Sequence, residues 1–283
     1  MTSVEVIGDK KCSLPQLPFA LSKQPSVLQT KDNEILVCGG DGDNIKQCSV
    51  LKEQKWIKHS ELYKARFYGS GVTMPLPTGV YLFGGWADPT TSVFLPNGST
   101  TWQTGPNIPD GGLKQGCSVK ISDFEIMLIG GFTTEKRVIK FNSKTHKWTP
   151  MGELQEGRFG HACIATNAKV IITGGKNSDF QYLNSTEIIS LNNPTNSRTV
   201  GHLNEARAFH GLAVSHVNNQ PTTIAFGGSN LVKGSDGWVY TFRDSVEIWN
   251  PDLETWTLDT DIKLDEKKDE FGFLSVPSHL LCH

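Results

Sequence analysis

Five Gly-Gly pairs, each placed directly after a short apolar run, divide the chain at nearly even intervals. The second glycines are residues 40, 85, 131, 175 and 228, so successive pairs lie 45, 46, 44 and 53 residues apart. Their mean spacing, (228 − 40)/4 = 47, fits six times into the 283 residues of the chain. A period of roughly 40–50 residues is typical of propellers and other repeat proteins. The sequence therefore predicts a repeat architecture rather than an ordinary fold around one core.

Tryptophan recurs at a fixed place in most of these units. It follows the second glycine by 16, 17 and 17 residues in the first three units, at Trp56, Trp102 and Trp148. In the fifth unit Trp256 comes 28 residues after the pair, because the segment 229–243 lengthens the preceding loop. Large apolar side chains at a repeated position suit the space between packed sheets, provided that each indole N–H finds an acceptor.

Each unit reads as four short strands, which we name a to d in chain order. The apolar runs are 4–7 residues long, rich in β-branched and aromatic residues, and bounded by Gly, Pro or Asn, which favours strands over helices. Strand a is exemplified by Gly160–Ala165 and strand c by Ser245–Asn250, whereas strand b ends at the Gly-Gly pair. We therefore predict an all-β chain of four-stranded antiparallel sheets.

The two ends of the chain supply the remaining unit. Ser3–Gly8 matches the strand c of Ser245–Asn250, Asp269–Val276 reads as a strand a, and His279–His283 reads as a short strand b. Joining both ends in one sheet closes a ring and protects open sheet edges. We predict a single domain over residues 1–283, with units near 17–59, 60–107, 108–152, 153–202 and 203–262 and a sixth from 263–283 with 1–16.

An arginine follows strand d in three of the units, at Arg66, Arg158 and Arg207. With the Gly-Gly pairs and the spaced tryptophans, these arginines make the chain resemble kelch repeats over essentially its whole length. The resemblance implies a six-bladed β-propeller whose sixth blade is shared between the N- and C-terminus. It also implies a partner-binding face on the rim formed by the d–a and b–c loops. This chain contains no BTB domain, so we do not expect it to act alone as a ubiquitin-ligase substrate receptor.

The predicted function is non-enzymatic binding of a protein partner at this rim, as a scaffold or interaction module. Arginine beside aromatic residues is typical of binding hot spots, and variable loops on a rigid scaffold often carry recognition. Three structural alternatives stay open: the arginines tie blades together, the aromatic residues plug the channel, and 229–243 is a simple insertion. The candidate partner-binding residues are Arg66, Tyr68, Trp86, Lys114, Lys136, Arg137, Arg158, Phe159, Arg207, Phe209, Lys233, Trp238 and Tyr240.

Two other function classes compete with partner binding. A carbohydrate-active enzyme of the mutarotase kind would need His, Arg and carboxylate side chains at one channel opening, for which the sequence offers His161, His210 and Arg158 without a clear carboxylate. An actin-binding or purely structural module is the other alternative. Two aligned histidines are too few for a metal site, which needs three or four converging ligands. We predict no catalytic residue, no metal and no cofactor.

Charge and hydropathy exclude two classes of partner. The 27 Lys+Arg and 29 Asp+Glu residues give a net charge of −2, which argues against nucleic acid, since phosphate binding needs clustered cations. No apolar run approaches the roughly 18 residues that span a bilayer, so no membrane insertion is predicted. We expect a monomer.

The six cysteines leave the redox state of the chain open. Cys38 and Cys48 fall on neighbouring strands b and c of one unit and form a candidate disulfide. Cys117 and Cys163 hold equivalent places on inner strands and are interpreted as buried thiols. The N-terminus shows no basic region followed by an apolar one, so we expect a cytoplasmic protein. An extracellular protein, lacking its signal peptide in this chain, is the alternative.

Overall fold

The computed structural model is built of β-strands joined by turns and loops. The residues that it describes contain no helix, and so none that is long and apolar enough to cross a membrane. The described residues are 14–17, 23–40, 45–74, 79–194, 197–217, 220–235 and 237–274.

Five four-stranded antiparallel sheets follow one another along the chain, and we call them blades 1 to 5. Blade 1 contains β1 (Ser26–Gln29), β2 (Ile35–Cys38), β3 (Gln47–Lys52) and β4 (Lys55–Glu61). Blade 2 contains β5 (Ser70–Thr73), β6 (Gly79–Phe83), β7 (Ser92–Pro96) and β8 (Gln103–Thr104). Blade 3 contains β9 (Cys117–Lys120), β10 (Glu125–Ile129), β11 (Arg137–Asn142) and β12 (Lys147–Glu153).

The last two blades repeat this order, with one addition. Blade 4 contains β13 (Ala162–Thr166), β14 (Lys169–Thr173), β15 (Thr186–Ser190) and β16 (Arg198–Thr199). Blade 5 contains β17 (Gly211–Val217), β18 (Gln220–Phe226), β21 (Ser245–Asn250) and β22 (Thr255–Lys263). Between β18 and β21 the chain forms a separate two-stranded ribbon of β19 (Ser229–Gly234) and β20 (Gly237–Phe242).

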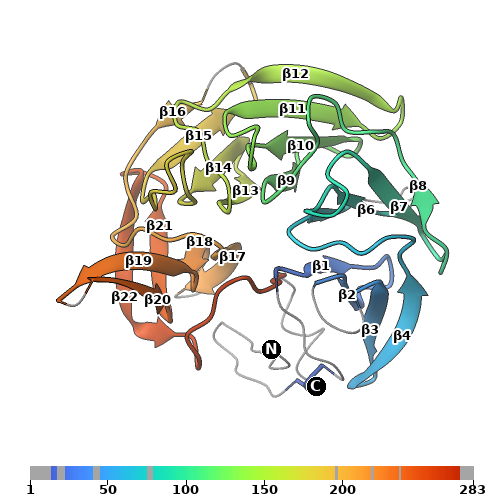
Figure 1. Ribbon diagram of the computed structural model, residues 1–283, viewed down its shortest axis with the longest axis horizontal. Coiled ribbons are helices and arrows are strands. Elements are labelled where there is room, and N and C mark those ends of the chain that lie inside the picture. The colour runs from blue at the N-terminus through green and yellow to red at the C-terminus, as the bar shows by residue number, and fades with distance from the viewer. Residues whose placement is uncertain are drawn as a thin grey trace.

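The blades stand around a common centre, which makes the molecule a β-propeller (Figure 1). The first strands of neighbouring blades, from β1 to β17, lie against one another at this centre. The second strands have side chains buried on both faces, as in β6 and β14, because each blade packs between two others. This double burial explains why the strands before the Gly-Gly pairs are continuous apolar runs rather than alternating ones.

The described residues form five blades, whereas the sequence predicted six. Residues 1–13 and 275–283, which were expected to supply most of the sixth blade, lie outside the described residues. In the described stretch 265–274 no strand forms, although Asp269–Val276 was predicted as one. This stretch nevertheless spans from blade 5 to blade 1, since the amide of Gln24 donates to the carbonyl of Glu270 at 2.7 Å.

The Gly-Gly pairs make the same contact at each junction between blades. The second glycine donates its N–H to a carbonyl in the segment that leads into the next blade, at 2.8–3.0 Å. The first glycine is needed at Gly84, for example, because its φ is +60° and an added Cβ would lie 2.1 Å from the carbonyl oxygen of Leu113. The five bonds run from Gly40 to Arg66, Gly85 to Leu113, Gly131 to Arg158, Gly175 to Arg207 and Gly228 to Lys268.

The tryptophans on the outer strands pack toward the preceding blade. Trp102 is 1 % exposed and donates its indole N–H to Ser60 Oγ of blade 1 at 3.0 Å. Trp256 of blade 5 donates to Thr186 Oγ1 of blade 4 at 2.9 Å. The expected role of these side chains between blades is therefore confirmed for both residues.

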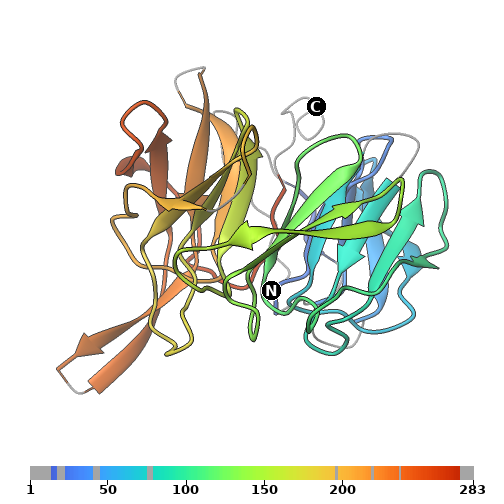
Figure 2. The same cartoon turned by 90° about the horizontal axis from the view of Figure 1, so that it is seen from above.

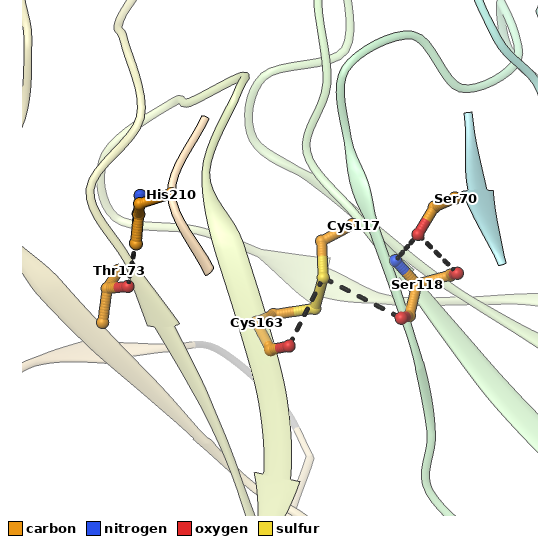
Figure 3. The surroundings of a disulfide bond; sticks show 6 residues. All are labelled: Ser70, Cys117, Ser118, Cys163, Thr173 and His210. Atoms are coloured by element: carbon orange, nitrogen blue, oxygen red, sulfur yellow. Dashed lines mark hydrogen bonds between the residues drawn. A yellow bond between two sulfur atoms is a disulfide. The ribbon is translucent and has the colours of Figure 1, made fainter. Parts of the chain in front are cut away.

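Among the described residues, two disulfides link cysteines on neighbouring strands. Cys38 and Cys48 face each other across β2 and β3 and are bonded, as the candidate pairing proposed. Cys117 and Cys163 are bonded across blades 3 and 4 (Figure 3). Their interpretation as buried thiols was wrong, because β9 and β13 are neighbours at the centre of the ring and bring equivalent positions together.

We expect the disulfide between blades to contribute more stability than the one within blade 1. It closes a loop of 46 residues, compared with 10 for Cys38–Cys48, and chain entropy gives about 4 and about 2.7 kcal/mol for loops of these lengths. The double variants Cys117→Ser/Cys163→Ser and Cys38→Ser/Cys48→Ser, compared by urea unfolding, should rank in that order. Equal losses, or the reverse order, would contradict the loop-length argument.

Candidate functional site

The arginines that were predicted to bind a partner are buried inside their own blades. Arg158 is 0 % exposed and donates to the backbone oxygens of Gly174 (2.8 Å) and Ser185 (3.2 Å). Its second terminal nitrogen binds Glu187 Oε1 on β15 at 2.6 Å. The side chain therefore joins the start of strand a to strands b and c of the same blade.

Further hydrogen-bond donors hold Glu187 at this junction of strands a, b and c, which we call the corner of the blade. It is 0 % exposed and accepts the backbone N–H groups of Gln155 (2.8 Å) and Glu156 (3.1 Å) and the hydroxyl of Ser197. Burial opposes ionisation, but the charge of Arg158 and these hydrogen bonds prevail and lower the pKa of Glu187 below its ordinary value. The buried ion pair is thus fully hydrogen-bonded on the carboxylate side.

Blade 5 repeats the arrangement at equivalent positions. Arg207, also 0 % exposed, binds the carbonyl of Gly227 at 3.0 Å and Glu247 Oε1 at 2.7 Å. Glu247 accepts the amides of Asn204 (2.6 Å) and Glu205 (3.2 Å). The two corners share the spacing Gln/Asn-Glu-x-Arg before strand a and Ser-x-Glu at strand c. This pattern is visible in the sequence, but it was not among the predicted motifs.

Arg66 of blade 2 makes the corresponding bonds without a carboxylate. It is 6 % exposed and binds the carbonyl of Gly84 (2.6 Å) and the hydroxyl of Thr91 (2.7 Å). The assignment of Arg66, Arg158 and Arg207 as partner-binding residues is therefore corrected: their guanidinium groups are turned into the blades and are not available to a partner.

A ring of six backbone hydrogen bonds surrounds the channel at the end where the d–a loops meet. Each bond links neighbouring units, and its N···O distance lies between 2.6 and 3.3 Å. The donors in turn are Tyr68, Gln115, Gly160, Phe209, Glu270 and Gln24, and the acceptors are Lys23, Tyr68, Gln115, Gly160, Phe209 and Glu270. All of these residues have positive φ. Six segments therefore meet at this mouth, although five blades are described.

Aromatic residues fill this mouth. Phe159 and Phe209 are 3 % and 5 % exposed, and Tyr68 lies against Phe209 with 5.7 Å between ring centroids. The hydroxyl of Tyr68 donates to the carboxylate of Glu270, whose pKa is raised mainly by burial. Among the alternatives, the structure thus places Phe209 as a plug of the channel mouth, whereas Phe159 packs against Phe132 and Phe180 of the b–c loops.

Below the ring of hydrogen bonds, the inner strands enclose a cavity of about 290 Å³. Its wall includes the Cys117–Cys163 disulfide, and the hydroxyls of Ser70 and Ser118, 2.7 Å apart, lie beside it (Figure 3). His161 and His210 line it as well. The described residues of the wall include no carboxylate, and no cluster of three metal-ligating side chains occurs among the described residues.

The two histidines of the cavity are deeply buried and neutral. Burial, together with the charge of Arg158, lowers the pKa of His161 to about 3. Burial and the charge of Arg207 lower the pKa of His210 well below its ordinary value, and its Nε2 lies 2.8 Å from Thr173 Oγ1. Both rings pack on glycines of the preceding blade. An added Cβ on Gly130 would lie 2.8 Å from the His161 ring, and one on Gly174 would lie 2.8 Å from the His210 ring. Their placement is that of packing residues.

Of the remaining candidates, Trp86 and Lys136 lie in b–c loops, Lys114 lies in a d–a loop, and Arg137 begins β11. Trp86 is 44 % exposed, and Lys114 lies over its ring at 5.5 Å. Lys136 is exposed as well. Arg137, in contrast, donates to the backbone oxygens of Pro109 (2.7 Å) and of two further residues in the loop 105–116, which joins blades 2 and 3. Its guanidinium therefore holds this loop against blade 3 and is not free to bind a partner.

The segment 229–243 is an ordered β-ribbon rather than a loop. Trp238 is 67 % and Tyr240 42 % exposed, and Lys233 lies opposite Trp238 in the register. These strands were not predicted, although a Gly-Ser-Asp-Gly turn between two alternating runs is a hairpin signal. Phe180, which is 60 % exposed on the b–c loop of blade 4, was not among the predicted residues either.

Removing one partner of a buried ion pair should lower the unfolding free energy substantially. Arg158→Met leaves Glu187 charged inside the blade, and we expect a loss of about 3–5 kcal/mol of unfolding free energy. The matched control is Arg198→Met, whose partner Glu254 lies at the surface and whose loss should be about 1 kcal/mol or less. Urea unfolding measures both. Similar losses in the two variants would show that the corner of blade 4 does not depend on Arg158.

The buried histidine predicts acid sensitivity. An unfolded chain binds a proton at His161 near pH 6.5, but the folded protein does so only near pH 3. Between these values the unfolding free energy should fall as the pH falls, by up to about 1.4 kcal/mol per pH unit for each such histidine. His161→Gln should reduce the slope between pH 6 and 4 by about 1 kcal/mol per unit, whereas the exposed-site control His146→Gln should not. If the pH dependence of the unfolding free energy is unchanged in His161→Gln, the lowered pKa of His161 in the folded protein is wrong.

Comparisons with known proteins bear on the fold. No known protein family and no curated protein sequence matches the chain. Among solved structures, the chain is similar to YjhT, with a TM-score of 0.75 at 11 % sequence identity over 92 % of this chain and 89 % of that one. At this identity the similarity shows the fold alone, and it agrees with the ring of sheets: the chain is a β-propeller of four-stranded antiparallel blades.

Proposed function

We propose that this propeller is a non-enzymatic module that binds a protein partner on the rim formed by its b–c and d–a loops. The strongest support comes from the positions of the exposed hydrophobic side chains. Twelve large hydrophobic residues are exposed in the described part of the chain. Seven lie in b–c loops, and an eighth, Tyr63, lies in a d–a loop. Contiguous exposed apolar surface on one face marks an interaction site.

Cations accompany these apolar side chains. Lys176 lies over the rings of Tyr182 (4.5 Å) and Phe209 (5.0 Å), and Lys114 lies over Trp86. Of these three rings Trp86 is exposed, Tyr182 is half-buried and Phe209 is buried, and an exposed aromatic ring with an adjacent cation is typical of the residues that dominate protein interfaces. The rim therefore offers both apolar area and positive charge to a partner.

We further propose that the chain is a kelch-type propeller with a sixth unit completed by its two ends. Lys268 supports this among the described residues, because its carbonyl accepts the Gly228 amide as the carbonyls of Arg158 and Arg207 accept theirs. Glu270 takes the sixth place in the ring of hydrogen bonds at the mouth. The predicted strands in 1–16 and 275–283 stay a prediction.

The enzymatic alternative, a carbohydrate-active site at the channel mouth, has less support. An acid or base there needs a pKa near the working pH and access to substrate. His161 and His210 are neutral, deeply buried and packed on backbone. We therefore favour binding at the rim over chemistry in the channel, whereas an actin-binding or scaffold role is one form of the same proposal.

The disulfides favour the extracellular alternative over the cytoplasmic expectation. Cys38–Cys48 and Cys117–Cys163 are both formed, and structural disulfides persist mainly in oxidising compartments. We propose that the protein works, as a monomer, in such a compartment.

The rim proposal predicts a selective loss of partner binding. The double variant Trp86→Ser/Phe180→Ser, used as bait beside the wild type in a pull-down from the native source, should lose a partner that the wild type retains. The matched control is Phe124→Ser/Leu253→Ser, which removes two residues of similar exposure, 42 % and 71 %, from turns at the opposite end of the strands.

Equal thermal midpoints of the three proteins are required before their partners are compared by mass spectrometry. A partner that is retained by the control and lost by the rim variant supports the proposal. If the control loses the same partner, the binding face lies elsewhere. If no bait retains a partner from the native source, the proposal of a binding module is wrong.

A further inference from the structure

The ribbon of β19 and β20 has one open edge, and we propose that this edge binds an extended segment of the partner as an added β-strand. The partner's side chains would pack on the aromatic face that Trp238, Tyr240 and Phe242 form along β20. This inference rests on the proposed function and names the mode of recognition at one part of the rim.

The pairing within the ribbon determines where the backbone groups of β20 point. Arg243 donates its N–H to the carbonyl of Gly228 at 2.8 Å, so this pair is hydrogen-bonded across the ribbon. Bonded and non-bonded pairs alternate in an antiparallel ladder, which makes Asn230–Thr241 and Val232–Val239 bonded in the observed register. The N–H and C=O groups of Trp238, Tyr240 and Phe242 therefore point away from β19.

The opposite edge of the ribbon is bonded along its first half. Ser229 exchanges two backbone bonds with Ala208, both at 2.9 Å. The N–H of Leu231 is taken by Asn230 Oδ1 at 2.7 Å. On β20, in contrast, no outward backbone bond occurs at Trp238, Tyr240 or Phe242 within the described part of the molecule. β20 is thus the edge at which another strand can pair.

The same three residues leave an apolar face in water beside this edge. Side chains two residues apart lie on one face of a strand, and Trp238, Tyr240 and Phe242 are 67 %, 42 % and 43 % exposed. Leu231, opposite Tyr240 in the register, adds a further 39 % exposed side chain to this face. A two-stranded ribbon with its apolar face uncovered is marginal by itself, and a third strand is what it lacks.

The base of the ribbon is rigid, so the edge is presented in a fixed direction. Tyr240 donates its hydroxyl to Asp269 at 2.6 Å, and Arg243 binds Glu205 at 2.7 Å. From this base the ribbon projects away from the body of the ring (Figure 2). A preformed edge of this kind binds an extended segment with little loss of its own conformational freedom.

The available area favours a peptide strand over a second copy of the chain. With about 150–250 Å² for each aromatic side chain, the exposed parts of the three rings amount to roughly 300 Å². Two copies packed face to face would then bury roughly 600 Å² in total, less than the 1,200 Å² or so of a stable interface. An extended segment needs less area, because backbone hydrogen bonds along the edge supply affinity.

The experiment uses peptides, since the partner is unidentified. A displayed library of random 12-residue peptides is selected on the full chain, and the strongest binder is synthesised. Its affinity is measured for Trp238→Ala, Phe242→Ser and the control Val239→Ser, whose side chain is 49 % exposed on the other face of β20. We expect roughly tenfold weaker binding for each of the first two variants and no change for the control.

A fourth variant separates the edge from the aromatic face. Trp238→Pro removes an outward N–H as well as the ring, whereas Trp238→Ala removes the ring alone, and proline is tolerated at a free edge. If a strand is added, Trp238→Pro should bind several-fold more weakly than Trp238→Ala, with unchanged thermal midpoints. Bound peptide should also slow amide hydrogen exchange at residues 238, 240 and 242.

Several results would overturn the inference. Equal affinities of the Pro and Ala variants, or no protection of these amides, would show that no strand is added. Binding that is unaffected by Trp238→Ala, or a selection that yields no binder, would remove the ribbon as a docking site. Concentration-dependent dimers in sedimentation, abolished by Trp238→Ala, would make a second copy the occupant. In each case loss of the partner in Trp86→Ser/Phe180→Ser would still support the rim proposal, so the two failures are distinguishable.

Discussion

The hydrogen bond from a Gly-Gly amide to the carbonyl at the head of the next unit is the contact on which the ring depends. It occurs five times among the described residues, and it requires glycine at the first position of each pair, because an added Cβ there would lie 2.1–2.9 Å from the nearest atom of the next segment. Backbone thus meets backbone at every junction, with no side chain between. This explains why the glycine pairs are the most regular feature of the sequence.

The repeat could be predicted because its signals are local: glycine pairs, apolar runs and the spacing of tryptophan. The role of the arginines could not be predicted in the same way, since Arg158 meets Glu187 only after strands a, b and c have folded into one sheet with a defined register. Arginine beside Phe159 has the composition of a binding hot spot, and composition carries no information about the direction of a side chain. The disulfide of Cys117 and Cys163 was missed for a related reason, because equivalence between blades, not sequence distance, brings the two together.

The centre of the ring and its rim have opposite properties. At the mouth, backbone bonds join six segments and buried aromatic rings fill the space inside them, so little there can change without disturbing every unit. The b–c loops carry Trp86, Phe180 and the aromatic ribbon partly into solvent, although Phe180 also packs against Phe159 at the mouth. The cavity below the mouth belongs to the rigid part, which is why its histidines are neutral and held against glycine.

The ribbon shows how such an insertion is tolerated. It starts directly after Gly228, whose amide remains bound to Lys268, and it ends before Ser245, whose hydroxyl and carbonyl remain bound to Glu205 and Arg207. The corner of blade 5 is therefore closed in the same way as that of blade 4, although Ser245 follows Gly228 by 17 residues and Ser185 follows Gly175 by only 10. Because both strands of the ribbon enter and leave through this corner, the blade fixes the base of the ribbon. Binding of a strand along β20 would then act on a rigid edge without changing the register of any blade.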